Sequence, residues 1–431
     1  MIYAQLARFL FPLVLTMVVY GLSGQVLNGG MARVPRATET LAAFGLAWGV
    51  TDFLASPISQ VRQVGLVLAT STASLRRVRN FVLVAGLGLS AILPLLGMTQ
   101  LGNWVIEDLH GVEAGLGKVV RSGILYFSFI PILEAWNRFY SGLLLQVRRT
   151  EIVSLATLAG IGANILAVFA LLPLEWVRHQ PILLPVVAVY AGYAVNLGIL
   201  FRGYQRCVKK SLPTGESGEL TYLYILKFFW PLALVMAIQG FSRPLINLFV
   251  SRGADGKDAL AALAVVYSLA HLLYGWVNEI RSLPAAFKQV PDHLRYIRRF
   301  AGGCGLLSFV IMMLMFWTPL RDIILIEWIG IGPELAALCA TPLFLFTFFP
   351  LAVMVRGYVN GIALVEHRTR ALAPSAPSRI GIILVVLMVL PGMGISGATL
   401  GVTALLFGFV LEATVVWVGV RGWQRWFGRA Q

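Results

Sequence analysis

Apolar residues in this chain form twelve long runs, and short polar connections separate them. A helix crosses the hydrocarbon core of a bilayer in about 20 residues, which is close to the length of most of these runs. Prolines inside several runs predict local kinks or unwound turns. The pattern therefore predicts an all-α polytopic membrane protein with about twelve spans. These spans cover residues 6–29, 41–70, 80–102, 119–146, 151–173, 183–206, 222–250, 259–287, 299–319, 335–363, 376–392 and 396–420.

The charges in the connections predict how the chain is oriented. Connections after even-numbered spans are basic, whereas those after odd-numbered spans are mixed or acidic, as at Glu107, Asp108 and Glu327. By the positive-inside rule, the even-numbered connections and both termini face the cytoplasm. We therefore expect a multi-pass protein of the cell (inner) membrane. The bases on the cytoplasmic side include Arg76, Arg77, Arg79, Arg148, Arg149, Arg206, Lys209, Lys210, Lys288, Arg295, Arg298, Arg299, Arg368 and Arg370.

The second half of the chain repeats the first. Residues 9–17 resemble residues 228–236, so that Pro12 corresponds to Pro231 at an offset of 219 positions. The same offset continues without a gap as far as Gly142 and Gly361. Matching Pro, Asn, Arg and Gly residues in register indicate a duplication. Further pairs in register are Gly21 and Gly240, Ser23 and Ser242, Asn28 and Asn247, Arg62 and Arg281, Arg76 and Arg295, and Pro131 and Pro350.

The duplication predicts two six-helix bundles, at 1–212 and 220–431, joined by a polar cytoplasmic linker at 213–219. Because six is an even number of spans, both halves enter the membrane in the same direction. They are then expected to be related by a pseudo-two-fold axis along the membrane normal, with a substrate site between them near the midplane. An inert scaffold left by duplication is the alternative.

The composition excludes several other classes of protein. Hydrophobic residues make up 58% of the chain and charged residues only 12%, about half the charged fraction of soluble domains. The net charge is +15, but the bases lie between apolar runs, so we expect no nucleic-acid partner. The three cysteines form no CxxC pair and the histidines lack metal-ligand spacing, so we predict neither metal nor cofactor. A GxGxxG match at 392–397 joins two apolar helices and predicts a tight turn rather than an enzyme motif.

Ionisable side chains also lie inside the predicted spans, where a central charge costs about 2.5–3.5 kcal/mol on the lenient insertion scale. Such groups are expected to form buried pairs between helices or to line a polar cavity. Arginine dominates the set, and its rigid fork suits carboxylate and phosphate groups. A cavity lined by arginine would attract a multiply charged anion. The set comprises Asp52, Arg62, Glu134, Arg138, Arg243, Glu279, Arg281, Arg356, Arg379 and Glu412, together with His271.

The two best-matched arginines have two interpretations. Arg62 and Arg281 lie on the cytoplasmic side of their helix centres, where the side chains would either snorkel to the interface or line a cavity. Ser242, Arg243 and Pro244 place a guanidinium beside a helix break, where freed backbone groups would also meet a ligand. We favour cavity lining at both places.

The remaining charges differ in their sequence context. Glu134 and Arg138 are four residues apart and predict an internal ion pair. Arg356 and Arg379 have no acid nearby in the sequence and are candidate cavity residues. We expect Glu412 to have a structural role, and a role as a proton carrier is the alternative.

Several segments resemble the progressive ankylosis family of polyanion exporters. The most specific are Ser-Arg-Pro at 242–244 and Tyr-Gly-Trp followed by Glu-Ile-Arg within 274–281. The resemblance spans nearly the whole chain and implies a fold similar to the MATE transporters of the MOP flippase superfamily. It also implies export of pyrophosphate, ATP or citrate. The chain lacks the long acidic C-terminal tail of vertebrate members, which indicates a bacterial-type member. Asp52 stands where vertebrate members are expected to have a base, which favours a smaller or less charged anion.

We hypothesise an alternating-access exporter of pyrophosphate, ATP or a citrate-like organic anion. The bilayer and this small anion are the expected partners; the sequence does not fix the oligomeric state and is compatible with a monomer. The cationic side chains expected to hold the anion are Arg243, Arg281, Arg62 and Arg356. The groups expected to add hydrogen bonds or charge balance are His271, Asn28, Asn247, Ser242 and Glu279. The groups expected to carry protons are Asp52, Glu279 and Glu412.

Other functions stay open at this point. A drug antiporter or a lipid-linked oligosaccharide flippase of the same superfold would depend on the acids Asp52 or Glu279. A non-transporting membrane scaffold or an intramembrane enzyme would instead pack its halves without a cavity that reaches solvent.

Overall fold

The computed structural model describes residues 2–31, 33–109, 114–209, 220–252, 256–329 and 331–427. Within these ranges the side chains at 18, 20–26, 28, 38, 109, 251, 256, 257 and 421–427 lie outside the description, as does the expected linker at 213–219. Every regular element in the described ranges is helical, which confirms the all-α fold class. Eleven described helices are long and apolar enough to cross a membrane, and a shorter apolar helix at Ile2–Met17 lies at the first predicted span. The protein is therefore a multi-pass membrane protein.

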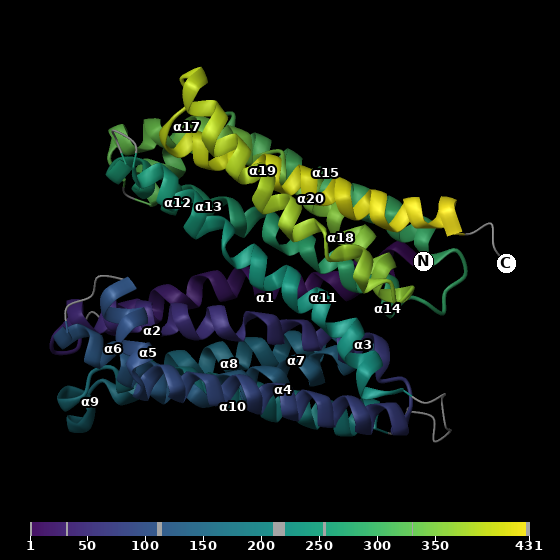
Figure 1. The fold of residues 1–431 in the computed structure, drawn as a ribbon, viewed down its shortest axis with the longest axis horizontal. Helices are drawn as coiled ribbons and strands as arrows, with labels where there is room; N and C mark the ends of the chain where they lie inside the picture. The colour runs from purple at the N-terminus through teal and green to yellow at the C-terminus, as the bar shows by residue number, and fades with distance from the viewer. Residues whose placement is uncertain are drawn as a thin grey trace. The chain divides into compact units, whose positions relative to one another are not determined.

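The chain divides into two compact units (Figure 1). We call Phe11–Phe229 the N-lobe, and Met1–Leu10 together with Trp230–Gln431 the C-lobe. Each of the two dividing points falls inside a helix. The first turns of each of these helices pack in one unit, and the rest of the helix packs in the other. The two helices divided in this way are α1 (Ile2–Met31) and α11 (Tyr222–Gly240).

Aromatic contacts hold these first turns in place. In the C-lobe, the ring of Phe9 packs edge-on against Phe287, with ring centroids 5.7 Å apart. In the N-lobe, Phe229 packs in the same way against Phe81 at 5.4 Å, and Arg77 donates a hydrogen bond to the Leu220 carbonyl at 2.8 Å.

The N-lobe is built from long helices interrupted by short 3₁₀ and π segments. After α1 come α2 (Ala37–Ala55), η1 (Ser56–Gln60), α3 (Val61–Leu68), α4 (Thr72–Met98), α5 (Gln100–Asn103), η2 (Trp104–Leu109), α6 (Ala114–Tyr126), η3 (Phe127–Phe129), α7 (Ile130–Gln146), α8 (Thr150–Leu171), α9 (Glu175–His179), α10 (Leu183–Gly203) and η4 (Tyr204–Val208).

The C-lobe follows the same plan. After α11 come α12 (Ser242–Ser251), α13 (Gly256–Tyr274), η5 (Gly275–Ser282), α14 (Leu283–Ala286), α15 (His293–Phe316), α16 (Leu320–Asp322), η6 (Ile323–Trp328), α17 (Pro333–Phe346), α18 (Phe349–Val365), η7 (Thr369–Leu372), α19 (Ser375–Val389), η8 (Leu390–Met393) and α20 (Gly397–Phe427).

The sequence repeat reappears in the element bounds. α2 and α13 begin and end 219 positions apart, and so do α7 and α18 and the π segments η2 and η6. The left-handed backbone at Arg148 (φ 60°) recurs at His367 (φ 57°), which lies at the same offset. Two residues at this offset are called repeat mates below. The duplication therefore recurs in the structure of both lobes, in the bounds of these elements and in this left-handed turn.

The second and eighth spans are interrupted at equivalent positions. α2 passes into the 3₁₀ segment η1 before α3, and α13 passes into the longer 3₁₀ segment η5 before α14. Pro57 lies at the start of η1, and Pro284 lies in α14 directly after η5. Each proline lacks the backbone N–H that would donate a helical hydrogen bond. A 3₁₀ stretch inside a helix commonly marks a functional hinge.

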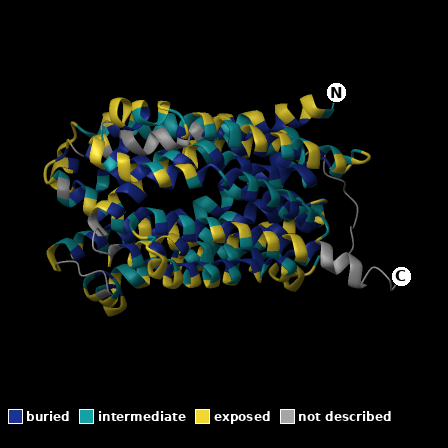
Figure 2. Cartoon of the chain, turned by 90° about the horizontal axis from the view of Figure 1, so that it is seen from above, coloured by how far each residue is buried: buried dark blue, intermediate teal, exposed yellow. Residues whose placement is uncertain are grey.

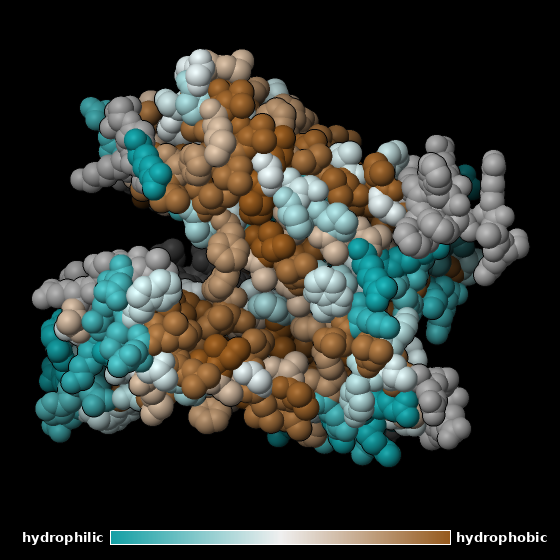
Figure 3. Space-filling view, viewed as in Figure 1, coloured by the Kyte–Doolittle hydropathy of each residue, from teal (hydrophilic) through white to brown (hydrophobic). Residues whose placement is uncertain are grey.

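Residues are distributed as expected for helices in lipid. Figure 2 shows exposed residues recurring along the outer faces of the helices and buried ones where the helices pack. In each lobe a hydrophobic middle lies between more hydrophilic ends (Figure 3). Between α19 and α20 the chain turns through η8, with positive φ at Gly394 (80°) and Gly397 (62°). These two conformations favour glycine, and they confirm the tight turn predicted at 392–397.

Candidate anion site in the C-lobe

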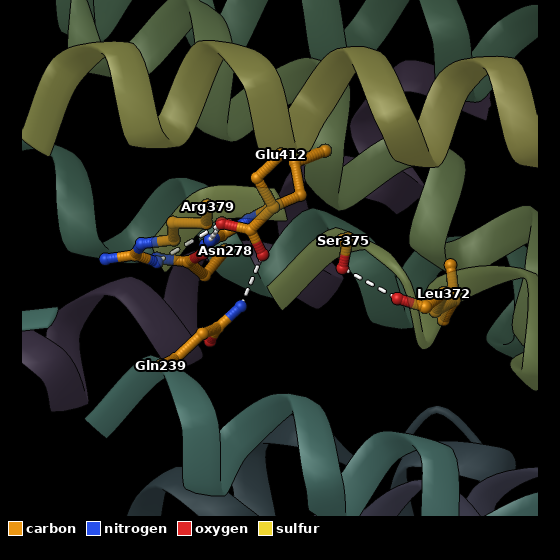
Figure 4. Close-up of polar contacts among 7 residues, drawn as sticks. Gln239, Asn278, Leu372, Ser375, Arg379 and Glu412 are labelled. Carbon is orange, nitrogen blue, oxygen red and sulfur yellow. Dashed lines mark hydrogen bonds and ion pairs between the residues drawn. The ribbon is translucent and has the colours of Figure 1, made fainter. Parts of the chain in front are cut away.

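Glu412 is the centre of a buried polar cluster in the C-lobe (Figure 4). The residue lies on α20 and is 0% exposed. One carboxylate oxygen accepts hydrogen bonds from Arg356 on α18 at 3.0 Å and from Arg379 on α19 at 3.2 Å. The other accepts a hydrogen bond from the Gln239 amide on α11. A single carboxylate on α20 is thus hydrogen-bonded to side chains of three other helices, α11, α18 and α19.

The two guanidinium groups have further partners. Arg356 donates to the Asn278 side-chain oxygen on η5 at 2.6 Å. Phe409, one turn before Glu412 on α20, receives both cations on its ring face, with Arg356 at 4.9 Å and Arg379 at 4.2 Å from the ring centroid. Such cation–π contacts stabilise a desolvated guanidinium. Arg356 and Arg379 are 9% and 6% exposed, so two buried cations share one buried anion. The cluster keeps one positive charge out of water, which is costly unless a ligand compensates it.

A more accessible cation lies beside this buried cluster. Arg243 on α12 is exposed, and its guanidinium lies over the Tyr267 ring at 4.9 Å from the centroid. Its side chain also interacts with Tyr274, whose ring packs against Phe409 with centroids 6.4 Å apart. The aromatic rings on α13 and α20 therefore connect the exposed arginine to the buried pair.

His271 belongs to the same accessible layer. Its exposed imidazole packs edge-on against Tyr274 with centroids 5.5 Å apart. The ring also lies against Gly275, where an added Cβ would come within 3.0 Å of it. Tyr274 at the end of α13 and Gly275 at the start of η5 thus pack against the imidazole, and Tyr274 links it to Arg243.

α12 begins at this cluster. α11 ends at Gly240 and α12 starts at Ser242, so the predicted helix break at Ser242, Arg243 and Pro244 is present. The N-terminus of a helix carries unpaired N–H groups and a partial positive charge. The Ser242 hydroxyl is fully buried and has no hydrogen-bond partner among the described residues. Asn247, one turn along the same helix from Arg243, is exposed.

The matched arginines Arg62 and Arg281 occupy equivalent places in their own lobes. A glycine allows a neighbouring helix to approach the backbone of each one closely. A methyl group on Gly361 would lie 2.8 Å from the Arg281 carbonyl oxygen, and one on Gly142 would overlap the Arg62 carbonyl oxygen. Arg62 is buried and Arg281 is half-buried. Both have interactions within the protein, as does the buried Glu279, so these groups are already partnered.

The N-lobe holds an acidic counterpart to this site. Asp52, the repeat mate of His271, is exposed near the end of α2. It is within electrostatic range of both Glu134 and Arg138 on α7. These two form an ion pair at 2.5 Å, which confirms the predicted internal pair. Two acids and one base leave this group with a net negative charge.

The lobes differ at the very positions of the buried C-lobe cluster. Asn137 and Tyr193 are the repeat mates of Arg356 and Glu412, and in the N-lobe the Asn137 amide donates to the Tyr193 carbonyl at 3.5 Å. Gly160 is the mate of Arg379, and a methyl group there would lie 2.8 Å from the Gly192 carbonyl oxygen. A neutral contact and close helix packing thus replace the ion cluster. The fold does not require charge at these positions.

Several predicted residues come together in the C-lobe and others do not. Arg243, His271, Arg356 and Glu412 belong to one cluster, with Ser242 and Asn247 on α12 and with Glu279 and Arg281 on the same element as Asn278. Arg62 and Asp52 belong to the N-lobe, and the side chain of Asn28 lies outside the described residues.

Sequence reasoning missed Gln239, Asn278, Tyr267, Tyr274 and Phe409, and ranked Arg379 below Arg356. The sequence contains a signal for two of these residues, Gln239 and Phe409. Gln239 adjoins the Gly240 break, and Phe409 lies three residues before Glu412 on the same helical face.

Comparisons with known proteins place the fold. The family model "Progressive ankylosis protein (ANKH)" matches residues 1–318. The chain is similar to a point mutant of the MATE transporter VcmN of Vibrio cholerae, with TM-score 0.75 and 14% identity over 98% of this chain and 97% of that one.

Two further solved structures are similar. The eukaryotic MATE transporter AtDTX14 has TM-score 0.65 and 14% identity over 96% of this chain and 95% of that one. A MOP superfamily transporter from Pyrococcus furiosus, described by the phrase "reverse polarity of binding pocket", has TM-score 0.66 and 15% identity over 98% and 95%.

Proposed function

The chain belongs to the progressive ankylosis protein family and is a membrane transporter with the fold of MATE proteins, and we propose that it exports a polyanion by alternating access. Pyrophosphate, ATP or a citrate-like organic anion is the expected cargo. One observation carries the proposal: the buried side chains of Arg356 and Arg379 share a single carboxylate, that of Glu412. An anion that reaches these guanidinium groups compensates the remaining charge and forms paired hydrogen bonds.

In this proposal Arg243 is the first contact of the anion. Its guanidinium is exposed, and it stands at the start of α12, where the backbone N–H groups also favour negative charge. The buried Ser242 hydroxyl supplies one more donor at this helix end. His271 and Asn247 are exposed nearby and add hydrogen bonds to phosphate or carboxylate oxygens.

In this proposal the Glu412 carboxylate pairs with the two guanidinium groups in the absence of the cargo. It makes the contacts with Arg356 and Arg379 that a substrate carboxylate or phosphate would make. An anion with two or more charges can pair with both guanidinium groups and with Arg243, whereas an organic cation would be repelled. This arrangement favours polyanions over the cationic drugs that an acidic site would select.

Arg62, Arg281, Glu279 and Asn28 have supporting roles in the proposal. Arg62 and Arg281 stand at equivalent places in the two lobes and contribute a positive field to the path of the anion. Glu279 is buried two residues before Arg281 on η5 and is proposed to balance its charge. Asn28 is the repeat mate of Asn247 and is proposed as an additional hydrogen-bonding group.

Protons are the proposed coupling ions, and Asp52 is the proposed main carrier. It is exposed, and its carboxylate interacts with the Glu134–Arg138 pair. Because two acids share one base there, adding a proton to Asp52 relieves repulsion between the acids. Glu279 and Glu412 are further candidates because each is a buried acid.

The same acidic group supports a second candidate function. A drug antiporter or an oligosaccharide-lipid flippase of this superfold would use Asp52 and Glu134 for exchange and would need no buried cationic cluster. We rank it second because the C-lobe carries a buried positive charge that the duplicated fold does not require.

We further propose that the protein lies in the cell (inner) membrane with both termini in the cytoplasm. The basic connections after even-numbered spans support this orientation.

Uptake into proteoliposomes tests the function directly. Labelled pyrophosphate, ATP, citrate and malate would each be offered with and without a proton gradient, and a labelled organic cation would serve as the comparison. Saturable flux of at least one polyanion supports the proposal. Proton-driven flux of the cation alone would support the second candidate.

A further inference from the structure

Two adjoining hollows lie at the end of the N-lobe where α1 gives way to α2. The first has a volume of about 570 Å³, and Arg33 and Arg178 stand on its rim beside Pro35 and Pro173. The second has a volume of about 210 Å³, and its polar lining includes Arg36, Glu39, Thr40, Lys118, Ser122, Tyr126, His179 and Gln180. Hydrophilic side chains gather at this end of the lobe (Figure 3). Consecutive residues line the two hollows at 33–36 and at 178–179, so the hollows adjoin, and apolar side chains such as Val34, Leu172 and Ile182 also line them. We call their combined lining the basic surface.

Positive charge dominates this surface. Its side chains include four Arg or Lys residues and one histidine but only one acid, Glu39. Glu39 lies 3.6 Å from Arg36, which is longer than a hydrogen bond, and the Arg36 side chain is 62% exposed. Among the described residues, no carboxylate forms an ion pair with Arg33, Lys118 or Arg178. Exposed pairs are weak, so Glu39 cancels little of the local field.

The second lobe provides an internal comparison. The repeat mates of Lys118, Arg178 and His179 are Ala337, Gly397 and Ala398, and the mate of Arg36 is Asp255. Arg33 alone has a basic mate, Arg252. At these four positions the C-lobe lacks the bases, so the duplication alone does not account for their gathering in the N-lobe.

The chemistry of the lining suits phosphate. Arg36, Lys118 and His179 bring charged or aromatic N–H donors, and the Thr40 and Ser122 side chains add hydroxyl groups. Guanidinium groups bind phosphate oxygens in pairs, and a lysine adds a mobile point charge. The hollows lie in the N-lobe and share no residue with the C-lobe cluster around Glu412.

We propose that this basic surface is a second anion-binding site, which takes a phosphate-bearing anion. Two sources present this chemistry: a free di- or triphosphate, and the headgroup of an anionic phospholipid. The site is independent of the proposed transport site, because its residues lie in the other lobe.

Pyrophosphate binding to the full-length protein in nanodiscs tests the proposal. Calorimetry in pure phosphatidylcholine nanodiscs is expected to resolve two classes of sites. The Lys118→Gln/Arg178→Gln variant should weaken one class by about tenfold or more, because it removes two charge-assisted contacts. The matched control is Arg252→Gln/Arg321→Gln, which removes the same charge from the corresponding end of the C-lobe and should leave both classes intact.

The other arms of the experiment separate the sources and the two proposals. If a lipid headgroup is the occupant, nanodiscs that contain phosphatidylglycerol should abolish this class of pyrophosphate binding in the wild type. Native mass spectrometry should then show fewer retained phosphatidylglycerol molecules on the Lys118→Gln/Arg178→Gln variant. Arg356→Gln/Arg379→Gln should remove only the other class, so each proposal fails on its own variant. Equal binding of pyrophosphate and lipid by the wild type and Lys118→Gln/Arg178→Gln would overturn the inference.

Discussion

Arg356 and Glu412 form a buried ion pair, 3.0 Å apart, at the place where the N-lobe has only a neutral contact between their repeat mates Asn137 and Tyr193. Both contacts join the same two helices of the duplicated plan, α18 with α20 in one lobe and α7 with α10 in the other. A structural need for a polar link between these helices is thus met without charge in the N-lobe. The ion cluster in the C-lobe calls for another explanation, and we attribute it to the anionic cargo.

Replacing the carboxylate that Arg356 and Arg379 share should lower the stability of the protein. Glu412→Gln leaves Arg356 and Arg379 buried without an anion, which typically costs about 3–5 kcal/mol. We expect a clearly lower unfolding temperature for the purified variant, and a larger rise on adding pyrophosphate or citrate than the wild type shows. The control is Glu134→Gln, because its partner Arg138 is 42% exposed and the loss should be about 1 kcal/mol or less. A Glu412→Gln protein as stable as the wild type would argue against the cluster.

Close helix packing at Gly361 should be essential for the position of Arg281. A methyl group there would lie 2.6 Å from Pro284 Cγ on α14 and 2.8 Å from the Arg281 carbonyl oxygen, so Gly361→Ala must displace either α18 or the segment from η5 to α14. We expect destabilisation of about 1–3 kcal/mol and reduced anion flux. Gly303→Ala on α15 is the matched control, since nothing lies within 4 Å of the added atom. That change should be neutral or slightly stabilising. Equal unfolding temperatures for the two variants would refute the packing argument.

His367 should make stability depend on pH. Partial burial, with a smaller effect of the Lys288 ammonium group, lowers the pKa of His367 below its ordinary value. The unfolded chain then takes up the proton first as pH falls. The contribution of His367 to stability is therefore full above about pH 6.5, the ordinary value, and is lost as pH falls below it.

The comparison for this effect is His367→Asn, because asparagine tolerates the positive φ of 57° at this position. Thermal unfolding would be followed between pH 7.5 and pH 5.5 for both proteins. We expect the wild type to lose more stability over this range than the variant. The same loss in both would show that another group is responsible.

Asp52→Asn should uncouple transport from the proton gradient. The change removes the exposed acid beside the Glu134–Arg138 pair but leaves the C-lobe cations in place. We expect flux without a gradient to persist, while the stimulation by a gradient is lost. Glu151→Gln, which replaces an exposed acid at the start of α8, is the control and should keep the stimulation. Full stimulation in Asp52→Asn would exclude it as the proton carrier.

The sequence sufficed for features that depend on nearby residues. Hydropathy gives the spans, the repeat gives the plan of each lobe, and the spacing of Glu134 and Arg138 gives their pair, because residues four apart meet on a helix. The partner of Arg356 could not be found in this way. Glu412 is 56 positions away, and only the packing of α18 against α20 brings the two together. Phe409 reads as an ordinary apolar residue until two cations are found on its ring face.

The central claim is that the paired guanidinium groups of the C-lobe bind the transported anion. The most direct measurement is uptake of labelled pyrophosphate and citrate by proteoliposomes containing Arg356→Gln/Arg379→Gln, at equal reconstituted amounts of folded protein. Arg148→Gln/Arg149→Gln removes the same charge from a connection outside the spans and is the matched control. We predict that the first variant loses at least about nine-tenths of the flux, as the loss of a charge-assisted contact implies, and that the control keeps it. Wild-type flux in Arg356→Gln/Arg379→Gln would contradict the claim.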